Sequence, residues 1–147
     1  MECIFNNSVL ISDLQQIITI ENECYSHPWK FSHFYNELKN NYSLNCKLTT
    51  DNLIIGYSFS ILLFDELQIN NFCVHKNYQN RGFGSQLMEF TLNEAKNKKV
   101  KNVFLEVRES NLNAIKLYQK FNFKISGVRK NFYSTGENAL IMFLNFH

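Results

Sequence analysis

Residues 71–88 constrain the fold more than any other part of this sequence, because they lead from an apolar strand through a polar loop into a helix. The apolar run at residues 72–74 is typical of the end of a buried strand. Residues 79–84 then follow the pattern Q-x-x-G-x-G, and Gly84 opens a run with helical periodicity. Glycines in such a loop let backbone N–H groups approach a phosphate, and the following helix directs its positive end at the same point. With the added charge of Arg81, the stretch predicts a pyrophosphate-binding loop.

Hydrophobic periodicity along the chain predicts a mixed α/β fold with the element order βααβββαβαββ. Strands are expected at residues 3–5, 43–50, 53–64, 67–74, 103–107, 123–128 and 139–146. Helices are expected to begin after residue 12 or 13, after residue 32, at residue 84 and after residue 111. The strands before the glycine loop form an antiparallel meander, whereas the helical connection makes the next strand parallel to the last of them. A central, mostly antiparallel sheet with flanking helices follows.

The bulk properties of the chain narrow its class. The 147 residues contain no repeat and no linker, which predicts a single domain over residues 1–147. A net charge of +2 is too small to favour nucleic acid as a direct ligand. The four cysteines form no C-x-x-C pair and the histidines lack metal-ligand spacing, so we expect no metal. No secretory signal and no membrane-spanning run is visible, which indicates a cytoplasmic protein without a membrane partner.

The glycine pattern is weak evidence when it is taken alone, because a G-x-G pair in a polar loop is more often part of a simple turn. It is not a Walker A loop, since no G-K-[ST] follows. Nor is it the Rossmann fingerprint, which needs a third glycine and an acidic residue about twenty positions further on. The antiparallel meander in front of the loop also argues against a Rossmann unit.

Glu106 is the more informative residue. It interrupts the strand at residues 103–107, which is otherwise apolar enough to be buried on both faces. A buried carboxylate is costly unless it is paired or protonated, so its presence needs a cause. One cause is structural: an ion pair with Arg108, which shares its side of the strand, or a position at the strand's rim. The other is functional, because a carboxylate can act as a general base.

Tyr118 lies on the inward face of the helix for which Asn111 is the expected N-cap. A packed core aromatic is the common role of a tyrosine in so aromatic a chain. The helix begins beside the end of the Glu106 strand, however, and a phenol can protonate a departing thiolate that it contacts. Cys73 and His75, two positions apart, offer a thiolate–imidazole pair as a further alternative, but no third orienting residue accompanies them.

Together these segments resemble a known family. After the meander and the Q-x-x-G-x-G loop come Leu105-Glu106-Val107-Arg108 and then Ser110-Asn111-x-x-Ala114-x-x-x-Tyr118-x-x-x-x-Phe123. This combination resembles the GNAT superfamily of acetyl-CoA-dependent N-acetyltransferases and, within it, the RimI-type ribosomal-protein-alanine N-acetyltransferases. The similarity extends from the turn at residues 27–29 to the final strand. The loop pattern marks the superfamily, whereas the L-E-V-R, S-N-x-x-A and A-I-x-L-Y combination is much more specific.

The resemblance implies a GNAT fold and assigns the pyrophosphate to acetyl-CoA as cosubstrate. On this match Glu106 corresponds to the general base and Tyr118 to the general acid. Residues 80–85 would wrap the phosphates, and the backbone of residues 72–74 would hold the pantetheine arm like an added strand. The N–H of Val74 would also polarise the thioester carbonyl. The expected cosubstrate-binding residues are Phe72, Cys73, Val74, Asn80, Arg81, Gly82, Phe83, Gly84, Ser85 and Asn111.

The reaction that the resemblance implies is acetyl transfer to a protein N-terminus, namely the alanine of an S18-like protein of the small ribosomal subunit. Residues 127–136 resemble the acceptor-side segment of the family, whereas residues 75–77 depart from the acidic, proline-containing turn expected there. Within the same enzyme class, lysine side chains or small amines are the alternative acceptors. A non-catalytic acyl-CoA-binding module is the alternative from another class. Glu106 and Tyr118 speak against it, because binding alone needs neither.

Overall fold

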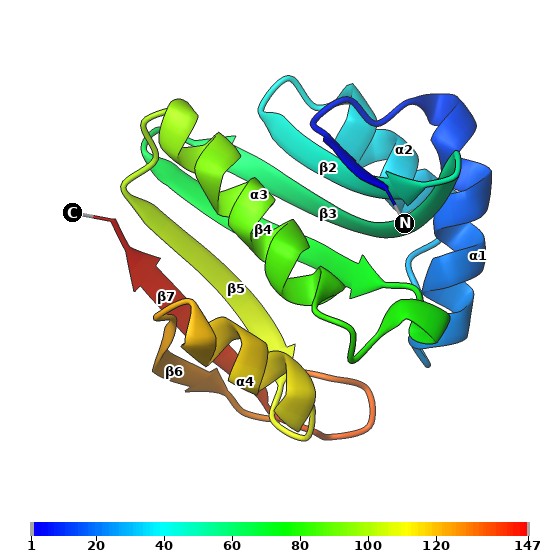
Figure 1. Cartoon of the computed structure of the whole chain (residues 1–147). Helices are drawn as coiled ribbons and strands as arrows, with labels where there is room; N and C mark the ends of the chain where they lie inside the picture. Colours follow the sequence, from blue (N-terminus) through cyan, green and yellow to red (C-terminus); the bar gives the residue numbers. More distant parts are fainter. Residues whose placement is uncertain (1, 147) are drawn as a thin grey trace.

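The computed structural model describes residues 2–146 and has the predicted order of helices and strands, with two short 3-10 helices in addition (Figure 1). The strands are β1 (Cys3–Asn6), β2 (Ser43–Thr50), β3 (Leu53–Leu63), β4 (Glu66–Val74), β5 (Asn102–Arg108), β6 (Lys124–Arg129) and β7 (Ala139–Asn145). The helices are α1 (Leu14–Cys24), α2 (Phe31–Lys39), α3 (Phe83–Asn97) and α4 (Leu112–Lys120). The 3-10 helices are η1 (Ile11–Asp13) and η2 (Lys76–Tyr78). Within residues 2–146, no helix has the length and apolar character needed to cross a membrane.

The strands form one sheet in the order β1-β2-β3-β4-β5-β7-β6. Neighbouring strands are antiparallel except β4 and β5, which run parallel because α3 makes the crossover between them. The mixed, mostly antiparallel sheet that the sequence predicts is therefore confirmed, including its single parallel pair.

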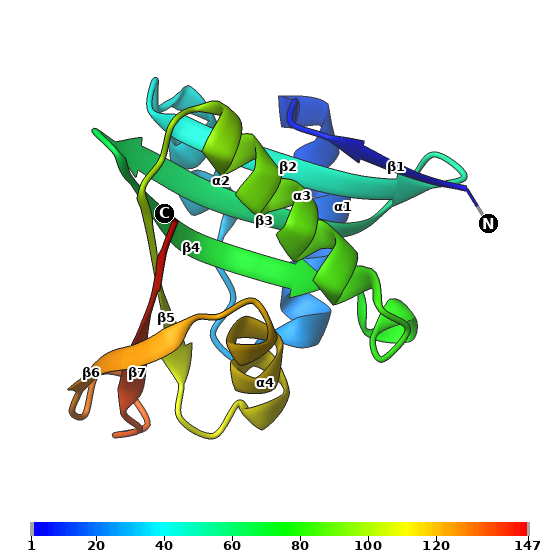
Figure 2. The same cartoon turned by 60° about the vertical axis from the view of Figure 1, so that its left-hand side comes forward.

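Helices cover both faces of the sheet (Figure 2). On one face, Leu87 of α3 and Ile115 of α4 belong to the largest hydrophobic cluster. On the other face, Ile17 of α1 and Phe34 of α2 pack with Phe59 of β3 in a second cluster. Both layers follow from apolar residues that recur at helical spacing, because such residues form a stripe that must be buried against the sheet.

The hairpin turns show where the sequence is informative about local structure. Asp51 and Asn52 form the β2–β3 turn with φ angles of 50° and 63°, positive values that Asp and Asn tolerate better than most residues. The sequence predicts the next turn at residues 65–66. The structure instead places it at Phe64, with a φ of 57°, and Asp65, so that Glu66 already begins β4. The error arises because Phe64 prolongs an apolar run.

Strands β4 and β5 pair over only the first part of their length. Their register ends at Ile69 opposite Leu105, although β4 continues to Val74 and β5 to Arg108. The register between β3 and β4 shifts at Asn70, which is the additional residue of a β-bulge. Bulges bend a strand and increase its twist. Beyond Asn70, β4 therefore presents to β5 an edge that no strand of residues 2–146 pairs with, in the interior of the sheet.

Candidate functional site

The unpaired edge of β4 is the centre of the site. Peptide groups alternate in direction along a strand, and the N–H of His75 bonds to β3. The backbone N–H and C=O groups of Phe72 and Val74 therefore point the other way, into the gap between β4 and β5. The carbonyl oxygen of Phe72 accepts a hydrogen bond from the Tyr25 hydroxyl at 2.5 Å, and that of Val74 accepts one from the Gln79 amide at 2.8 Å. The N–H groups of these two residues thus face a ligand in the gap as backbone donors, while their carbonyl oxygens already accept hydrogen bonds from side chains.

Two pockets open on this edge and share part of their walls. The first, of about 460 Å³, is called the carboxylate pocket here because Glu21 and Glu106 line it. The second, of about 510 Å³, is called the loop pocket because the glycine loop lines it. The residues that line both are Cys24, Tyr25, Phe72, Asn111 and Tyr118. Two ligands, one in each pocket, would therefore meet at the end of β4.

The glycine loop forms a wall of the loop pocket at the N-terminus of α3. Gly82 precedes the helix with a φ of 84°, a conformation that favours glycine. At Gly84 a Cβ would lie 3.4 Å from the Leu117 side chain, which is ordinary van der Waals contact between the start of α3 and α4. The first backbone N–H groups of a helix have no partner within it and lie at its positive end. The loop pocket therefore favours an anion such as a phosphate.

The side chains of Arg81 and Phe83 line neither pocket. Phe83 is buried in the core, and the Arg81 guanidinium lies over the rings of Tyr78 and Phe83, 5.3 and 5.5 Å from their centroids. Their side chains therefore lie outside both pockets in this structure. The other predicted cosubstrate-binding residues all line the loop pocket: Phe72, Cys73, Val74, Asn80, Gly82, Gly84, Ser85 and Asn111.

Positive charge reaches the loop pocket from α4. Asn113, Lys116 and Lys120 line it, and Lys120 Nζ donates a hydrogen bond to Ser85 Oγ at 3.1 Å. These residues were not predicted from the sequence. Their spacing of three and seven positions after Asn113 was the available signal, because it places them on one helical face. The predicted N-cap of this helix is confirmed, since the Asn111 side chain accepts a hydrogen bond from the backbone of α4 at 3.2 Å.

Strand β5 is buried on one face only, so the prediction of burial on both faces was wrong. Val103, Leu105 and Val107 are buried among side chains of α3 and α4. On the opposite face the side chains of β5, among them that of Glu106, are partly exposed, because α1 and α2 pack mainly on β2, β3 and β4. Glu106 is therefore open to the carboxylate pocket and does not carry the cost of full burial.

Glu106 pairs with Arg129 of β6, and not with Arg108 as its position in the sequence suggested. Glu106 Oε1 lies 3.3 Å from Arg129 Nε, and the two side chains are 25% and 55% exposed. Arg108 lies 3.6 Å from Glu137 instead, and its guanidinium stacks 3.8 Å from the centre of the Tyr133 ring. A solvent-exposed ion pair contributes only about 0–1 kcal/mol to stability. The stability gained from the ion pair with Arg129 is therefore too small to explain why a carboxylate stands at this position.

The loop between β6 and β7 borders the carboxylate pocket through Tyr133. The Ser110 hydroxyl and amide donate to the Glu137 carboxylate, which lowers the pKa of that carboxyl, and this ties the loop to the end of β5. On the other side, Ser134 Oγ lies 3.2 Å from His27 Nε2 in the segment that joins α1 and α2. The segment that resembles the acceptor side of the family therefore lies at the mouth of this pocket.

Two tyrosines, the buried Tyr118 and the partly buried Tyr25, lie at the junction of the pockets. Burial raises the pKa of both the Tyr118 and the Tyr25 phenol, so both remain protonated well above neutral pH. The Tyr25 hydroxyl is already bonded to Phe72, whereas within residues 2–146 no hydrogen bond engages the Tyr118 hydroxyl. Tyr118 also packs against Phe72 and Phe123, with ring centres 6.2 and 5.9 Å away. It therefore combines a core position with a hydroxyl that is free to donate.

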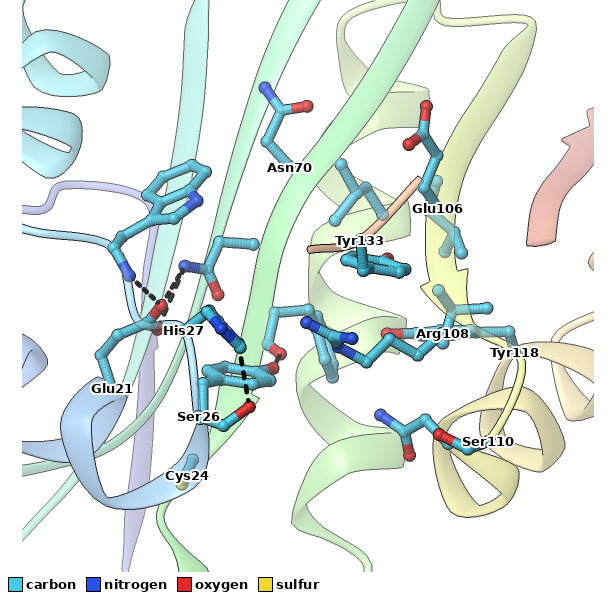
Figure 3. Close-up of a pocket in the computed structure, with 18 residues that line it drawn as sticks. Glu21, Cys24, Ser26, His27, Asn70, Glu106, Arg108, Ser110, Tyr118 and Tyr133 are labelled. Atoms are coloured by element: carbon cyan, nitrogen blue, oxygen red, sulfur yellow. Dashed lines mark hydrogen bonds between the residues drawn. The ribbon is translucent and has the colours of Figure 1, made fainter. Parts of the chain in front are cut away.

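Glu21, near the end of α1, is a buried carboxylate that the sequence analysis did not assign to the site. It is 1% exposed and accepts hydrogen bonds from the Trp29 N–H at 2.9 Å, the Tyr57 hydroxyl at 2.7 Å and the Asn71 amide at 3.1 Å. Figure 3 shows it on the opposite side of the pocket from Glu106. Its position on the apolar face of α1 was the available signal. Glu21 fixes the segment after α1 to β3 and β4.

Glu21→Ala should lower the free energy of unfolding by about 3 kcal/mol, because it leaves the buried Tyr57 hydroxyl and Asn71 amide without their acceptor. Urea unfolding followed by circular dichroism measures the change. Glu23→Ala is the matched control from the same helix, since Glu23 faces His75 at 3.7 Å with 40% of its side chain exposed. Equal losses in the two variants would contradict the anchoring role of Glu21.

Comparisons with known proteins agree with this geometry. Residues 14–123 match the profile of the Acetyltransferase (GNAT) family. The "[Ribosomal protein bS18]-alanine N-acetyltransferase" of Salmonella typhimurium is 34% identical over 136 residues, which cover 90% of this chain and 91% of the relative. The crystal structure of the ribosomal-protein-S18-alanine N-acetyltransferase from Escherichia coli superposes with a TM-score of 0.92 at 30% identity, covering 98% of this chain and 94% of that one. The PaiA N-acetyltransferase from Thermoplasma acidophilum, solved in complex with coenzyme A, shares the fold with a TM-score of 0.82 at 17% identity, covering 99% of this chain and 100% of its own.

Proposed function

Because this chain belongs to the Acetyltransferase (GNAT) family, we propose that it transfers the acetyl group of acetyl-CoA to the N-terminal α-amino group of a protein. The proposed acceptor is the alanine N-terminus of a small-subunit ribosomal protein, the substrate class named for the Salmonella relative. We place the reaction in the cytoplasm and in a single domain that spans the chain.

The meeting of the two pockets at the unpaired edge of β4 is the observation that carries the proposal. A transfer between two substrates requires that both reach one point in the correct orientation. The loop pocket offers a path for the donor and the carboxylate pocket one for the acceptor, with Phe72 and Tyr118 in the wall that they share. A module that only bound acyl-CoA would need the loop pocket alone, without Glu106 in a second one.

The loop pocket suits the donor along its whole length. The N-terminus of α3, Gly82 and Lys120 favour its phosphates, and the peptide groups of Phe72 and Val74 suit the amides of its pantetheine arm. We assign to the Val74 N–H the hydrogen bond that polarises the thioester carbonyl. The fold neighbour from Thermoplasma acidophilum, which was solved with coenzyme A, supports this choice of donor.

The proposed chemistry needs one proton acceptor and one proton donor. An amine arrives largely as ammonium, and Glu106 accepts its proton directly or through one water. The neutral nitrogen attacks the thioester carbon, the C–N bond forms, and the tetrahedral intermediate then breaks its C–S bond. Tyr118 gives its proton to the departing thiolate or donates a hydrogen bond to it. The products are an N-acetylated acceptor and free coenzyme A.

A single partly exposed carboxylate suits an α-amine better than a lysine. The pKa of an α-amino group is near 8 and that of a lysine near 10.4, so at neutral pH the α-amine is roughly 300 times more available as the free base. A carboxylate such as Glu106 therefore deprotonates the ammonium group of a protein N-terminus more easily than that of a lysine. This argument favours the N-terminal acceptor over the lysine alternative.

Peptide substrates test the acceptor directly. A peptide that begins with alanine and contains an internal lysine should be acetylated on its α-amine alone, as fragment mass spectra would show. The same peptide with a blocked N-terminus is the matched control and should remain unmodified. Acetylation of the internal lysine in both peptides would support the lysine alternative. Binding of coenzyme A without any acetylation would support the binding module.

Cellular N-termini test the identity of the acceptor. Mass spectrometry of N-terminal peptides from cells with and without this protein should show loss of acetylation on one ribosomal protein that begins with alanine. Changes confined to lysine side chains would overturn the proposed acceptor.

A further inference from the structure

Two cysteines from distant parts of the sequence meet at the end of β4. Cys24 ends α1, and Cys73 lies in β4. Both sulfur atoms lie 3.6 Å from the carbonyl oxygen of Val74, so the two thiols share one hydrogen-bond acceptor. His75, the partner of Cys73 considered from the sequence, instead accepts a hydrogen bond from the N–H of Asn77. The neighbour of Cys73 is therefore a second thiol and not an imidazole.

The two thiols differ in accessibility and in acidity. Cys24 is partly exposed and lines both pockets, whereas Cys73 is 5% exposed. The neighbouring Cys73 thiol lowers the pKa of Cys24, and the same interaction together with burial raises the pKa of Cys73. The thiolate is the nucleophilic form of cysteine. Cys24 is thus suited to attack a reagent from the pockets, with Cys73 held beside it as the second thiol.

The remaining cysteines do not share this arrangement. Cys46 is fully buried, where it interacts with Ser58 and Thr91, and burial raises its pKa to about 11. Cys3 lies in β1, at one end of the sheet. Strands β2 and β3 separate it from β4. Cys46 and Cys3 therefore serve as internal controls for the reactivity of the pair.

We propose that Cys24 and Cys73 form a reversible disulfide, and that its oxidant is a low-molecular-weight disulfide that enters through the loop pocket. In a reducing compartment such bonds are transient and regulatory and do not serve as permanent staples. The site is thus a thiol modification site next to, but not part of, the proposed acid–base machinery.

The exchange proceeds in two steps that balance. The Cys24 thiolate attacks one sulfur of the small disulfide, forms a mixed disulfide and releases one small thiolate. Cys73 then gives up its proton to the small thiolate released in the first step, attacks the Cys24 sulfur and expels the second small thiolate. Two protein thiols are oxidised to one disulfide, and one small disulfide is reduced to two thiols. A small thiol in excess reverses both steps.

The disulfide would change the site at its most sensitive point. It would fasten the end of α1 to β4 beside Val74, whose backbone we assign to the donor. This consequence rests on the proposed function: coenzyme A in the loop pocket should shield Cys24 and slow the oxidation. Where bound coenzyme A also shifts the disulfide equilibrium toward the thiols, the oxidised protein binds coenzyme A more weakly by the same factor.

Oxidised glutathione added to the purified full chain tests the pair. The intact mass should fall by two hydrogen atoms, a non-reducing digest should yield a peptide that links Cys24 to Cys73, and dithiothreitol should reverse the change. In Cys73→Ser, a stable glutathione adduct should remain on Cys24. Cys73→Ala repeats this test if the serine variant unfolds. A lasting adduct on Cys24 in the unsubstituted chain, or equal reaction at Cys46, would overturn the proposal.

Acetyl-CoA, which carries no free thiol that could reverse the exchange, separates this proposal from the proposed function. Disulfide formation that is slowed at least severalfold by saturating acetyl-CoA would support both. Formation at an unchanged rate would keep the thiol pair but contradict the donor site in the loop pocket. Tight binding of coenzyme A without any disulfide would overturn the thiol pair and leave the proposed function intact.

Discussion

Glu106→Gln is expected to slow acetyl transfer to an alanine-initiated peptide by about 10²–10⁴-fold at neutral pH, the usual effect of losing a general base. Glutamine keeps the size of the side chain but cannot accept a proton from the ammonium. Because Glu106 is partly exposed and its ion pair with Arg129 is open to solvent, the substitution should change stability little. Steady-state kinetics at saturating acetyl-CoA, with thermal unfolding measured in parallel, test both expectations.

The loss in Glu106→Gln should shrink as the pH rises. The α-amine has a pKa near 8, so at about pH 9 most of it is already neutral and needs no base. Glu109→Gln is the matched control, since Glu109 is a nearby exposed carboxylate that lines neither pocket and accepts a hydrogen bond from Asn138. It should react as the unsubstituted chain does. An undiminished rate in Glu106→Gln at neutral pH would remove Glu106 from the proposed mechanism.

The fold was predictable because its signals are local. Helical and alternating periodicities gave the order of the elements, and a helical connection between two apolar strands required the parallel pairing of β4 with β5. Boundaries moved by one or two residues, as at α2, which begins at Phe31 and not after residue 32. Phe64 shows one reason, because its apolar side chain continues the β3 pattern while its backbone forms the turn.

The surroundings of Glu106 were not predictable, because they depend on strand order. The sequence places Arg108 two positions from Glu106, but Arg129 comes from β6, which is separated from β5 in the sheet by β7. The exposure of one face of β5 likewise depends on where α1 and α2 pack, and not on the composition of β5 itself. Nonlocal contacts of this kind leave no trace in a single segment.

The pairing of Cys24 with Cys73 and the contribution of Lys120 were missed for a related reason. In each case two segments meet only because the β4–β5 gap lets α1, α3 and α4 converge on one strand end. The bulge at Asn70 bends β4 at the point where that gap begins. An Asn in an alternating polar and apolar stretch does not allow a bulge to be predicted from the sequence. Sequence reasoning found the residues that carry a motif and missed those that the gap assembles.

Tyr118→Phe is expected to lower kcat by about 10²-fold or more while leaving the dissociation constant of coenzyme A nearly unchanged. Phenylalanine keeps the ring contacts with Phe72 and Phe123 and removes only the hydroxyl, so the fold should persist. Because burial raises the pKa of Tyr118, the phenol holds its proton throughout the neutral range. Any loss of activity caused by its deprotonation should therefore lie at a pH above the usual tyrosine value near 10.

Tyr25→Phe distinguishes the acid from its neighbour at the same junction. The pKa of the Tyr25 phenol is also raised by burial, but its hydroxyl is committed to the Phe72 carbonyl at 2.5 Å, and it serves the strand edge. Tyr25→Phe should therefore weaken coenzyme A binding more than it lowers kcat, the reverse of the pattern for Tyr118→Phe. If kcat fell in Tyr25→Phe and not in Tyr118→Phe, the general acid would be Tyr25. Loss of a proton donor lowers the activity even of fully folded protein. If the activity of Tyr118→Phe fell only in proportion to a lowered unfolding temperature, Tyr118 would therefore be a packing residue.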